Sequence, residues 1–197
     1  MLIGGIQKFT LSDFPGIPAA IVFTQGCNFR CPFCHNGSLL PMQNTEHISA
    51  DKVLDWIYRK RGKLTGVVIS GGEPTLQHDL LDFIKQIRPM GYQIKLDTNG
   101  SKPSLIRELL ELQLLDFVAM DIKAPWHKYE QLCGVEIIPE TIQKSIAIIA
   151  TSGVRHTFRT TVVPELLTPE DITEIKSSLP ATSPYITQKF IKELAVI

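Results

Sequence analysis

Residues 65–91, TGVVISGGEPTLQHDLLDFIKQIRPMG, contain one complete strand, turn and helix in succession. The stretch begins with a short β-branched apolar run, passes through two glycines, and continues with apolar residues at helical spacing until Pro89 and Gly91. A buried strand followed by a tight turn and an amphipathic helix is typical of a β-α unit. Repeated units of this kind form a parallel sheet with right-handed crossovers.

The same alternation recurs on both sides of this unit. Further β-rich runs occupy residues 19–24, 92–97, 115–122, 154–163 and, more weakly, 184–190. Further helical patterns occupy residues 49–62, 102–112, 139–153 and 168–179. About six units are fewer than the eight of a closed barrel. The sequence therefore predicts an α/β fold, a partial (β/α)6 barrel with parallel strands, formed by a single domain over residues 1–197.

Composition narrows the class of protein. The 197 residues are 44% hydrophobic, enough for one well-buried core, and 20 Lys and Arg balance 20 Asp and Glu. A net charge of zero gives no overall field that would attract nucleic acid or an anionic membrane. No apolar run approaches the roughly 18 residues of a membrane span, and residues 1–16 lack the pattern of a signal peptide. We expect a cytoplasmic protein with neither nucleic acid nor a membrane as a partner.

Three of the four cysteines lie together in the stretch GCNFRCPFCHN, directly after the first of these apolar runs. In a reducing compartment, clustered cysteines are usually metal ligands or catalytic thiols. A redox dithiol would use Cys31 and Cys34 and leave Cys27 unexplained. Covalent haem attachment would use the C-x-x-C-H pattern that ends at His35, but it occurs on exported chains. Both interpretations leave part of the cluster unused.

Two metal-based interpretations remain. Zinc would need Cys27, Cys31 and Cys34 with a fourth ligand, and both candidates, the adjacent His35 and the distant Cys133, are poorly spaced for it. A [4Fe-4S] cluster takes four ligands, so three cysteines leave one iron with an open position. An open position on a metal can bind a substrate or cofactor.

The spacing C-x-x-x-C-x-x-C resembles the signature of the radical S-adenosylmethionine (radical SAM) superfamily, including the aromatic Phe33 just before the third cysteine. The resemblance implies that Cys27, Cys31 and Cys34 hold a [4Fe-4S] cluster. It also implies that S-adenosylmethionine (SAM) binds the open iron, and that the fold is the partial barrel of that superfamily.

A turn with one carboxylate follows the second apolar run, at the edge where ligands bind in a parallel α/β sheet. It consists of Gly71, Gly72, Glu73 and Pro74. A simple β-to-α turn would also explain the two glycines. The sequence resembles the GGE motif of the superfamily, which implies that the backbone and the Glu73 carboxylate hold the amino group of SAM.

Charged residues also follow the next two runs. Asp97 is followed by Thr98 and Asn99, and Asp121 shares a strand face with Lys123. Buried charges are costly unless they are paired or bind a ligand, so a structural ion pair is the alternative. These elements resemble the D-T-N-G and D-x-K motifs of glycyl-radical activating enzymes. The resemblance implies that Asp97, Thr98 and Asp121 bind SAM directly or through a monovalent cation, and that Lys123 contacts SAM.

The resemblance extends to the leader SDFPGIPAAIVFTQGCNFRCPFCHNG, which is similar to that of anaerobic ribonucleoside-triphosphate reductase activating proteins and pyruvate formate-lyase activating enzymes. Gly16, Gly26, His35 and Asn36 belong to that pattern. Arg159 is a further candidate on the fifth run, with a surface salt bridge as the alternative. The candidate cofactor-binding residues are Phe33, His35, Gly71, Gly72, Glu73, Pro74, Asp97, Thr98, Asn99, Asp121, Lys123 and Arg159.

The implied activity is reductive cleavage of SAM to a 5′-deoxyadenosyl radical, which takes a hydrogen atom from one glycine of a partner enzyme. The implied partners are anaerobic ribonucleotide reductase and a one-electron donor such as flavodoxin or ferredoxin. Two alternatives stay open: a radical SAM enzyme for a small molecule, similar to 7-carboxy-7-deazaguanine synthase, and a non-catalytic iron-sulfur or zinc module. A partial barrel favours the protein partner, because its open side can admit a peptide loop.

Overall fold

A computed structural model describes residues 1–42, 47–192 and 195. Within them, one seven-stranded sheet runs in the spatial order β1 to β7, with β1 and β7 at its two ends. The strands are β1 (Ile3–Thr10), β2 (Ala19–Thr24), β3 (Gly66–Gly71), β4 (Gln93–Thr98), β5 (Phe117–Asp121), β6 (Arg155–Val162) and β7 (Tyr185–Lys189). Strands β2 to β7 are mutually parallel, which confirms the predicted partial barrel.

Strand β1 was not expected from the sequence. It pairs with β2 in the antiparallel sense and forms one edge of the sheet. Its sequence contains Gly4 and Gly5 and an exposed Lys8, so its burial pattern lacks the apolar character of the central strands. An edge strand needs fewer apolar residues because one of its sides has no neighbouring strand.

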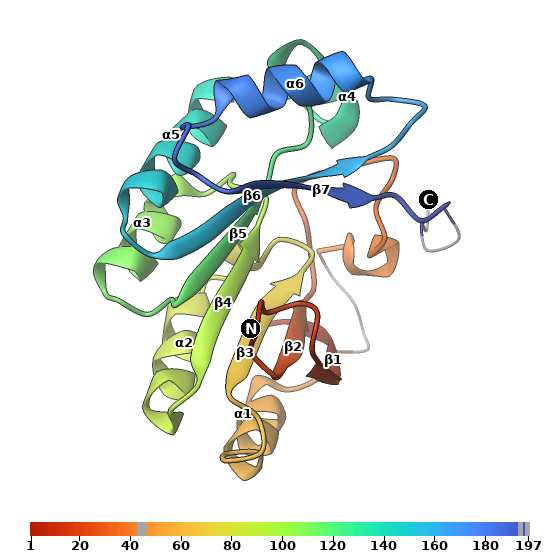
Figure 1. The fold of residues 1–197 in the computed structure, drawn as a ribbon. Helices are drawn as coiled ribbons and strands as arrows, with labels where there is room; N and C mark the ends of the chain where they lie inside the picture. The colour runs from red at the N-terminus through yellow and green to blue at the C-terminus, as the bar shows by residue number, and fades with distance from the viewer. Residues whose placement is uncertain (43–46, 193–194, 196–197) are drawn as a thin grey trace.

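In the described part of the chain, six α-helices accompany the strands, and Figure 1 shows them on one side of the fanned sheet. They are α1 (Ala50–Arg59), α2 (Leu80–Ile87), α3 (Pro103–Glu111), α4 (Tyr129–Cys133), α5 (Pro139–Thr151) and α6 (Pro169–Ser178). Three of them begin with proline, whose fixed φ suits the first helical turn. The short α4 was not predicted. Among the described residues, no helix has the length and apolar character needed to cross a membrane.

The expected helix over residues 75–91 begins later than its apolar spacing suggested. Residues Pro74–Leu76 form a 3-10 turn, and the α-helix starts only at Leu80. The turn forms because the Glu73 carboxylate accepts a hydrogen bond from the Thr75 backbone N–H. The strand end and its carboxylate are thereby held together before the helix begins.

Alternating side chains divide the buried residues into two clusters. Outward-facing residues such as Leu96 and Val118 join the larger core beneath the helices. Inward-facing residues form a smaller cluster of Phe14, Ala19, Ile21, Val68, Phe117 and Ala119. This second cluster fills the amino-terminal end of the barrel interior, so the carboxyl ends of the strands are left to form a cavity.

Candidate active site at the carboxyl ends of the strands

A cavity of about 190 Å³ lies where the parallel strands end. Its wall brings together every candidate residue named from the sequence except Pro74, which is buried outside the cavity lining. The lining residues are Cys27, Phe29, Cys31, Phe33, Cys34, His35, Asn36, Leu40, Ser70, Gly71, Gly72, Glu73, Asp97, Thr98, Asn99, Asp121, Lys123, Arg159, Thr161 and Gln188. Segments from six strand ends therefore contribute to one site.

The cysteine loop follows β2 and presents its three thiols to this cavity. Cys27, Cys31 and Cys34 are all free, and Cys27 is the most buried. The loop is fixed by backbone hydrogen bonds, including Cys34 N–H to the Cys31 carbonyl at 3.2 Å, and by the buried rings of Phe29 and Phe33. Among the described residues, no three His, Cys, Asp or Glu side chains meet around a single-ion site. All three cysteines line the cavity, and three thiols from one loop supply three of the four ligands of a [4Fe-4S] cluster.

Cys133 lies against the same loop, although almost a hundred residues separate it from Cys34 in the sequence. The Arg30 backbone N–H donates to the Cys133 carbonyl at 2.7 Å, and the Cys31 and Cys133 thiols hydrogen-bond to each other. That hydrogen bond lowers the pKa of Cys31 to about 7. Burial instead raises the pKa of Cys27 to about 11 and also raises that of Cys34. Sequence distance gave no sign of this contact.

The two glycines after β3 are required by packing against the neighbouring backbone. A Cβ atom at Gly72 would lie 2.1 Å from the Gly26 carbonyl oxygen, and one at Gly71 would lie 2.4 Å from the Thr24 nitrogen. The Glu73 N–H also donates to the Gly26 carbonyl at 2.8 Å. The Gly-Gly pair thus lets the Glu73 turn sit directly beside the start of the cysteine loop.

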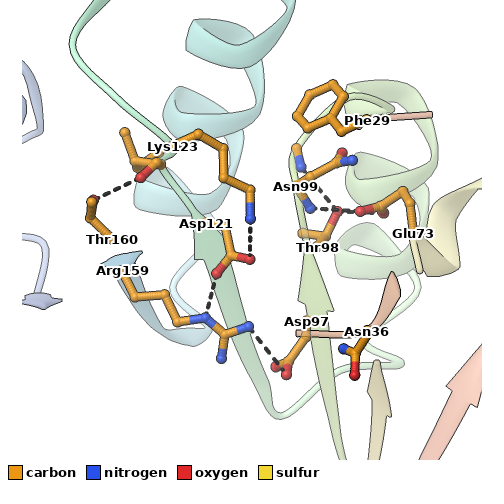
Figure 2. A network of polar contacts seen from close by, with 12 residues as sticks. Phe29, Asn36, Glu73, Asp97, Thr98, Asn99, Asp121, Lys123, Arg159 and Thr160 are labelled. Atoms are coloured by element: carbon orange, nitrogen blue, oxygen red, sulfur yellow. Dashed lines mark hydrogen bonds and ion pairs between the residues drawn. The ribbon is translucent and has the colours of Figure 1, made fainter. Parts of the chain in front are cut away.

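Glu73 is a buried carboxylate held by neutral donors. It accepts hydrogen bonds from Thr75, from the Thr98 hydroxyl at 2.7 Å and from the Asn99 backbone N–H at 2.6 Å, as Figure 2 shows in part. The side chain is 1% exposed, and this burial raises its pKa. The turns after β3 and β4 are therefore joined through one carboxylate that faces the cavity.

A chain of alternating charges occupies the opposite part of the wall (Figure 2). Arg159 on β6 bridges two carboxylates: its Nη2 lies 3.3 Å from Asp97 Oδ2, and its Nε bonds Asp121 Oδ1. Lys123 Nζ donates to Asp121 Oδ2 at 2.9 Å. The register of the sheet explains the bridge, because Asp121 and Arg159 are paired residues of β5 and β6. Arg159 is an interior bridging residue and its salt bridges lie away from the surface.

Mutual attraction sets the ionisation of this chain. Burial raises the pKa of Asp121, but Arg159 and Lys123 outweigh it and hold that pKa below its ordinary value. Burial lowers the pKa of Lys123 and of Arg159, and the nearby carboxylates outweigh it and raise both pKa values. All three groups are therefore charged at neutral pH, and the structural ion pair that the sequence left open as the alternative is present within the same cavity wall.

His35 links the cysteine loop to the carboxyl-terminal segment. Its ring stacks on Phe190 with centroids 5.5 Å apart and planes 6° from parallel. The Ile191 backbone N–H donates to His35 Nε2 at 3.4 Å. The segment after β7 thus covers one side of the loop.

Several residues of this site were not expected from the sequence. Ser70 donates to Asp97 Oδ2 at 3.1 Å, and Thr161 and Gln188 line the cavity from β6 and β7. Lys95 forms a buried ion pair with Asp97 from beneath. Lys95 could have been found, because it lies two residues before Asp97 and therefore shares its strand face. Thr161 could have been found in the same way, because it lies two residues after Arg159 and shares its strand face.

Most of the chain matches the model of a known protein family. Residues 21–179 match the family model of the Radical SAM superfamily, and the chain belongs to it. This superfamily uses a [4Fe-4S] cluster and SAM. The other interpretations of the cysteines, a redox dithiol, a haem attachment site and a zinc site, are thereby superseded.

Two relatives among known proteins narrow the resemblance. A Methanocaldococcus jannaschii protein named "putative glycyl-radical enzyme activating enzyme" is 32% identical over 96% of this chain and 80% of its own length. The pyruvate formate-lyase-activating enzyme of Clostridium pasteurianum is 34% identical over 61% of this chain. The chain spans only about half of the latter protein, 52% of its length.

Solved structures support the fold. Streptococcus suis SuiB bound to its precursor peptide SuiA superposes with a TM-score of 0.70 over 87% of this chain and 38% of that one, at 17% identity. TYW1 with a bound lysine-pyruvate adduct superposes with a TM-score of 0.69 over 94% of this chain and 72% of that one, at 18% identity.

Proposed function

We propose that this chain is a radical SAM activating enzyme that generates a glycyl radical on a partner protein. The observation that carries the proposal is the convergence of three thiols, one buried carboxylate and a chain of paired charges on one cavity. When bound, a [4Fe-4S] cluster reduced by an external one-electron donor would supply the electron that splits SAM into methionine and a 5′-deoxyadenosyl radical, the species able to remove a hydrogen atom from the glycine Cα. The protein supplies binding, orientation and exclusion of water.

The residues of the cavity have separate tasks in this proposal. Cys27, Cys31 and Cys34 hold the cluster. The Glu73 carboxylate, which is held by neutral donors, attracts the ammonium group of SAM. Lys123, at the end of the charge chain, attracts the SAM carboxylate. Opposite charges on opposite walls would orient the amino-acid end of SAM, and no side chain needs to act as a general base.

The proposal also names the partner protein and the electron donor. Two relatives are named as activating enzymes, one for glycyl-radical enzymes in general and one for pyruvate formate-lyase. The resemblance of the leader and cysteine loop favours anaerobic ribonucleotide reductase, with flavodoxin or ferredoxin as the electron donor. We further propose that one domain over residues 1–197 acts in the cytoplasm, and that the open side of the sheet between β1 and β7 admits the glycine loop.

The test has two stages. Protein reconstituted anaerobically with iron and sulfide is mixed with dithionite and SAM, and 5′-deoxyadenosine and methionine are measured. The same mixture is then incubated with candidate glycyl-radical enzymes and examined by EPR. A glycyl doublet is expected with one partner, and it should disappear when the partner's radical glycine is replaced by alanine. Cleavage of SAM without a glycyl signal on any partner would overturn the activase function.

A small-molecule substrate is the second candidate. The 7-carboxy-7-deazaguanine synthase of Hyperthermus butylicus is 33% identical over 48% of this chain. In that case 5′-deoxyadenosine would accumulate with a small-molecule substrate that leads to a carboxylated deazaguanine, and partner proteins would have no effect. Supplying each substrate class separately distinguishes the two functions.

A further inference from the structure

The charge chain in the cavity wall extends one residue deeper than the cavity itself. Lys95 Nζ bonds Asp97 Oδ1, and its side chain is only 4% exposed. Lys95 does not belong to the cavity lining, whereas Asp97 does. The lysine therefore reaches Asp97 from below the floor of the site.

The five members alternate in charge, in the order Lys95, Asp97, Arg159, Asp121 and Lys123. All come from the inward faces or ends of the neighbouring strands β4, β5 and β6. Three positive and two negative side chains give this group of five residues a net charge of +1. One further anionic group would neutralise it, and the carboxylate is the anionic group of SAM.

The carboxylate oxygens of Asp97 and Asp121 already have hydrogen-bond or ion-pair partners. Asp97 Oδ1 accepts from Lys95, and Asp97 Oδ2 accepts from Ser70 and pairs with Arg159. Asp121 Oδ1 accepts from Arg159 and Oδ2 accepts from Lys123. A sodium or potassium ion needs several oxygen ligands around it. Here each of these oxygens faces a positively charged nitrogen, so the donor set does not fit a monovalent cation.

We propose that Lys95 and Arg159 are built-in cations that replace a monovalent metal ion beside Asp97 and Asp121. Lys95 is the positioning residue of this pair, because it neutralises Asp97 without contacting the ligand. The inference rests on the proposed SAM-binding function. It assigns to this protein a SAM-binding site that needs neither sodium nor potassium.

The Lys95–Asp97 ion pair is buried, so its two charges depend on each other for compensation. Removing one partner of a buried ion pair leaves an uncompensated charge, which is strongly unfavourable. A Lys95→Met variant keeps a long apolar side chain but leaves Asp97 Oδ1 without its ammonium partner. A small metal cation that enters through the cavity can then compensate the unpaired carboxylate charge, so the variant should acquire the cation dependence that the wild-type protein lacks.

The experiment measures SAM affinity of the cluster-loaded protein by calorimetry in sodium, potassium or tetramethylammonium chloride at equal ionic strength. Wild-type affinity should agree within about twofold in the three salts. Lys95→Met should bind SAM at least about tenfold more tightly in sodium or potassium than in tetramethylammonium, in keeping with the cost of an unpaired buried charge. Lys95→Arg should behave as the wild type. Lys85→Met, which removes an exposed lysine on α2, is the matched control.

A second readout needs no cluster and no SAM. The melting temperature of the metal-free Lys95→Met protein should rise in sodium or potassium relative to tetramethylammonium, and that of the wild type should not. Should Lys95→Met fail to fold, the wild type still decides, because a wild-type affinity that rises fivefold or more with sodium or potassium overturns the inference. A Lys95→Met protein indifferent to the salt also overturns it. Absence of SAM binding by the wild type in every salt would instead refute the proposed function.

Discussion

Strands β4 and β5 have two faces of opposite chemistry. On β4, Ile94 and Leu96 point outward and are fully buried under the helices. Their neighbours Lys95 and Asp97 point inward and belong to the ionic chain of the site. Because the side chains of a strand alternate, one short segment serves both the core and the site.

The difference between the faces has a thermodynamic consequence. The outward face gains stability from burial of apolar surface, which is close to additive and independent of ligands. The inward face places charges in a poorly hydrated environment, where pairing roughly compensates the cost of desolvation. We therefore expect substitutions of outward-facing strand residues to change the free energy of unfolding. Substitutions of inward-facing strand residues should instead change cluster and SAM binding.

Loss of a cluster ligand should give the largest effect. In Cys31→Ala, iron bound after anaerobic reconstitution should fall from about four atoms per chain to near zero, because a cubane held by two protein thiolates is poorly retained. Iron analysis and the visible absorption of the cluster measure this. The metal-free variant should unfold at the same urea concentration as the metal-free wild type.

Cys133→Ala is the matched control for this experiment. Cys133 is fully buried and its thiol contacts Cys31, yet its role in the proposal is not that of a ligand. The control should retain the cluster. Retention of a full cluster by Cys31→Ala, or its loss in Cys133→Ala alone, would contradict the assignment of ligands.

An outward-facing substitution should give the next largest effect, on stability alone. Leu96→Ala removes a fully buried side chain and should lower the free energy of unfolding by about 2–5 kcal/mol. Urea denaturation measures this. Leu112→Ala, at a position that is 48% exposed, should cost less than about 0.5 kcal/mol. A tenfold loss of SAM affinity in the folded Leu96→Ala protein would show that the two faces are coupled.

The predictable part of the fold follows from this same alternation of faces. Central parallel strands are buried on both sides, so their largely apolar runs mark β2 to β5 clearly in the sequence. Strand β6, which is only partly buried, was found from its β-branched residues. Strand β1 was missed because its glycines and exposed residues give an edge strand little apolar signal. The five-residue α4 was missed because it is shorter than the repeat needed to show helical periodicity.

The predictable part of the site has a similar limit. Parallel strands all end at one edge of the sheet, so Glu73, Asp97 and Asp121 could be assigned to one cavity from the sequence. The partners within that cavity depend on register and tertiary packing. The pairing of Asp121 with Arg159 needs the β5–β6 register, and the contact of Cys133 with Cys31 needs the position of α4 against the cysteine loop.

Glu73 tests whether an inward-facing residue contributes to SAM binding. In Glu73→Gln the shape is kept and the negative charge is lost, so SAM affinity should fall about tenfold to a hundredfold, the usual range for a hydrogen bond to a charged group. Equilibrium binding to the cluster-loaded protein measures this. Glu108→Gln, at an exposed position on α3, should bind SAM as the wild type does. Unchanged affinity in Glu73→Gln would exclude Glu73 from the site.

The smallest effect is expected on the helical layer outside the sheet, where a charge contributes only to stability. Asp171 accepts hydrogen bonds from the Thr168 N–H at 2.8 Å and from Lys128 at 2.6 Å, and Lys128 and that N–H lower its pKa. A group with a lowered folded-state pKa stabilises fully above its unfolded pKa of about 3.9 and loses that contribution as the pH falls toward the folded value.

Asp171→Asn should therefore unfold at a lower urea concentration than the wild type at pH 7, by less than Leu96→Ala does. The difference should shrink at pH 3.5, because this pH lies below the ordinary carboxyl pKa of about 3.9 and the unfolded wild-type chain then takes up a proton at Asp171. Glu174→Gln, on the exposed side of α6, should show almost no difference at either pH. SAM affinity should be unchanged in both variants. If the difference in unfolding midpoint between Asp171→Asn and the wild type instead widened in acid, Asp171 would not be stabilised as an anion. The division between a stabilising outer layer and an ionic inner face would then need another physical basis.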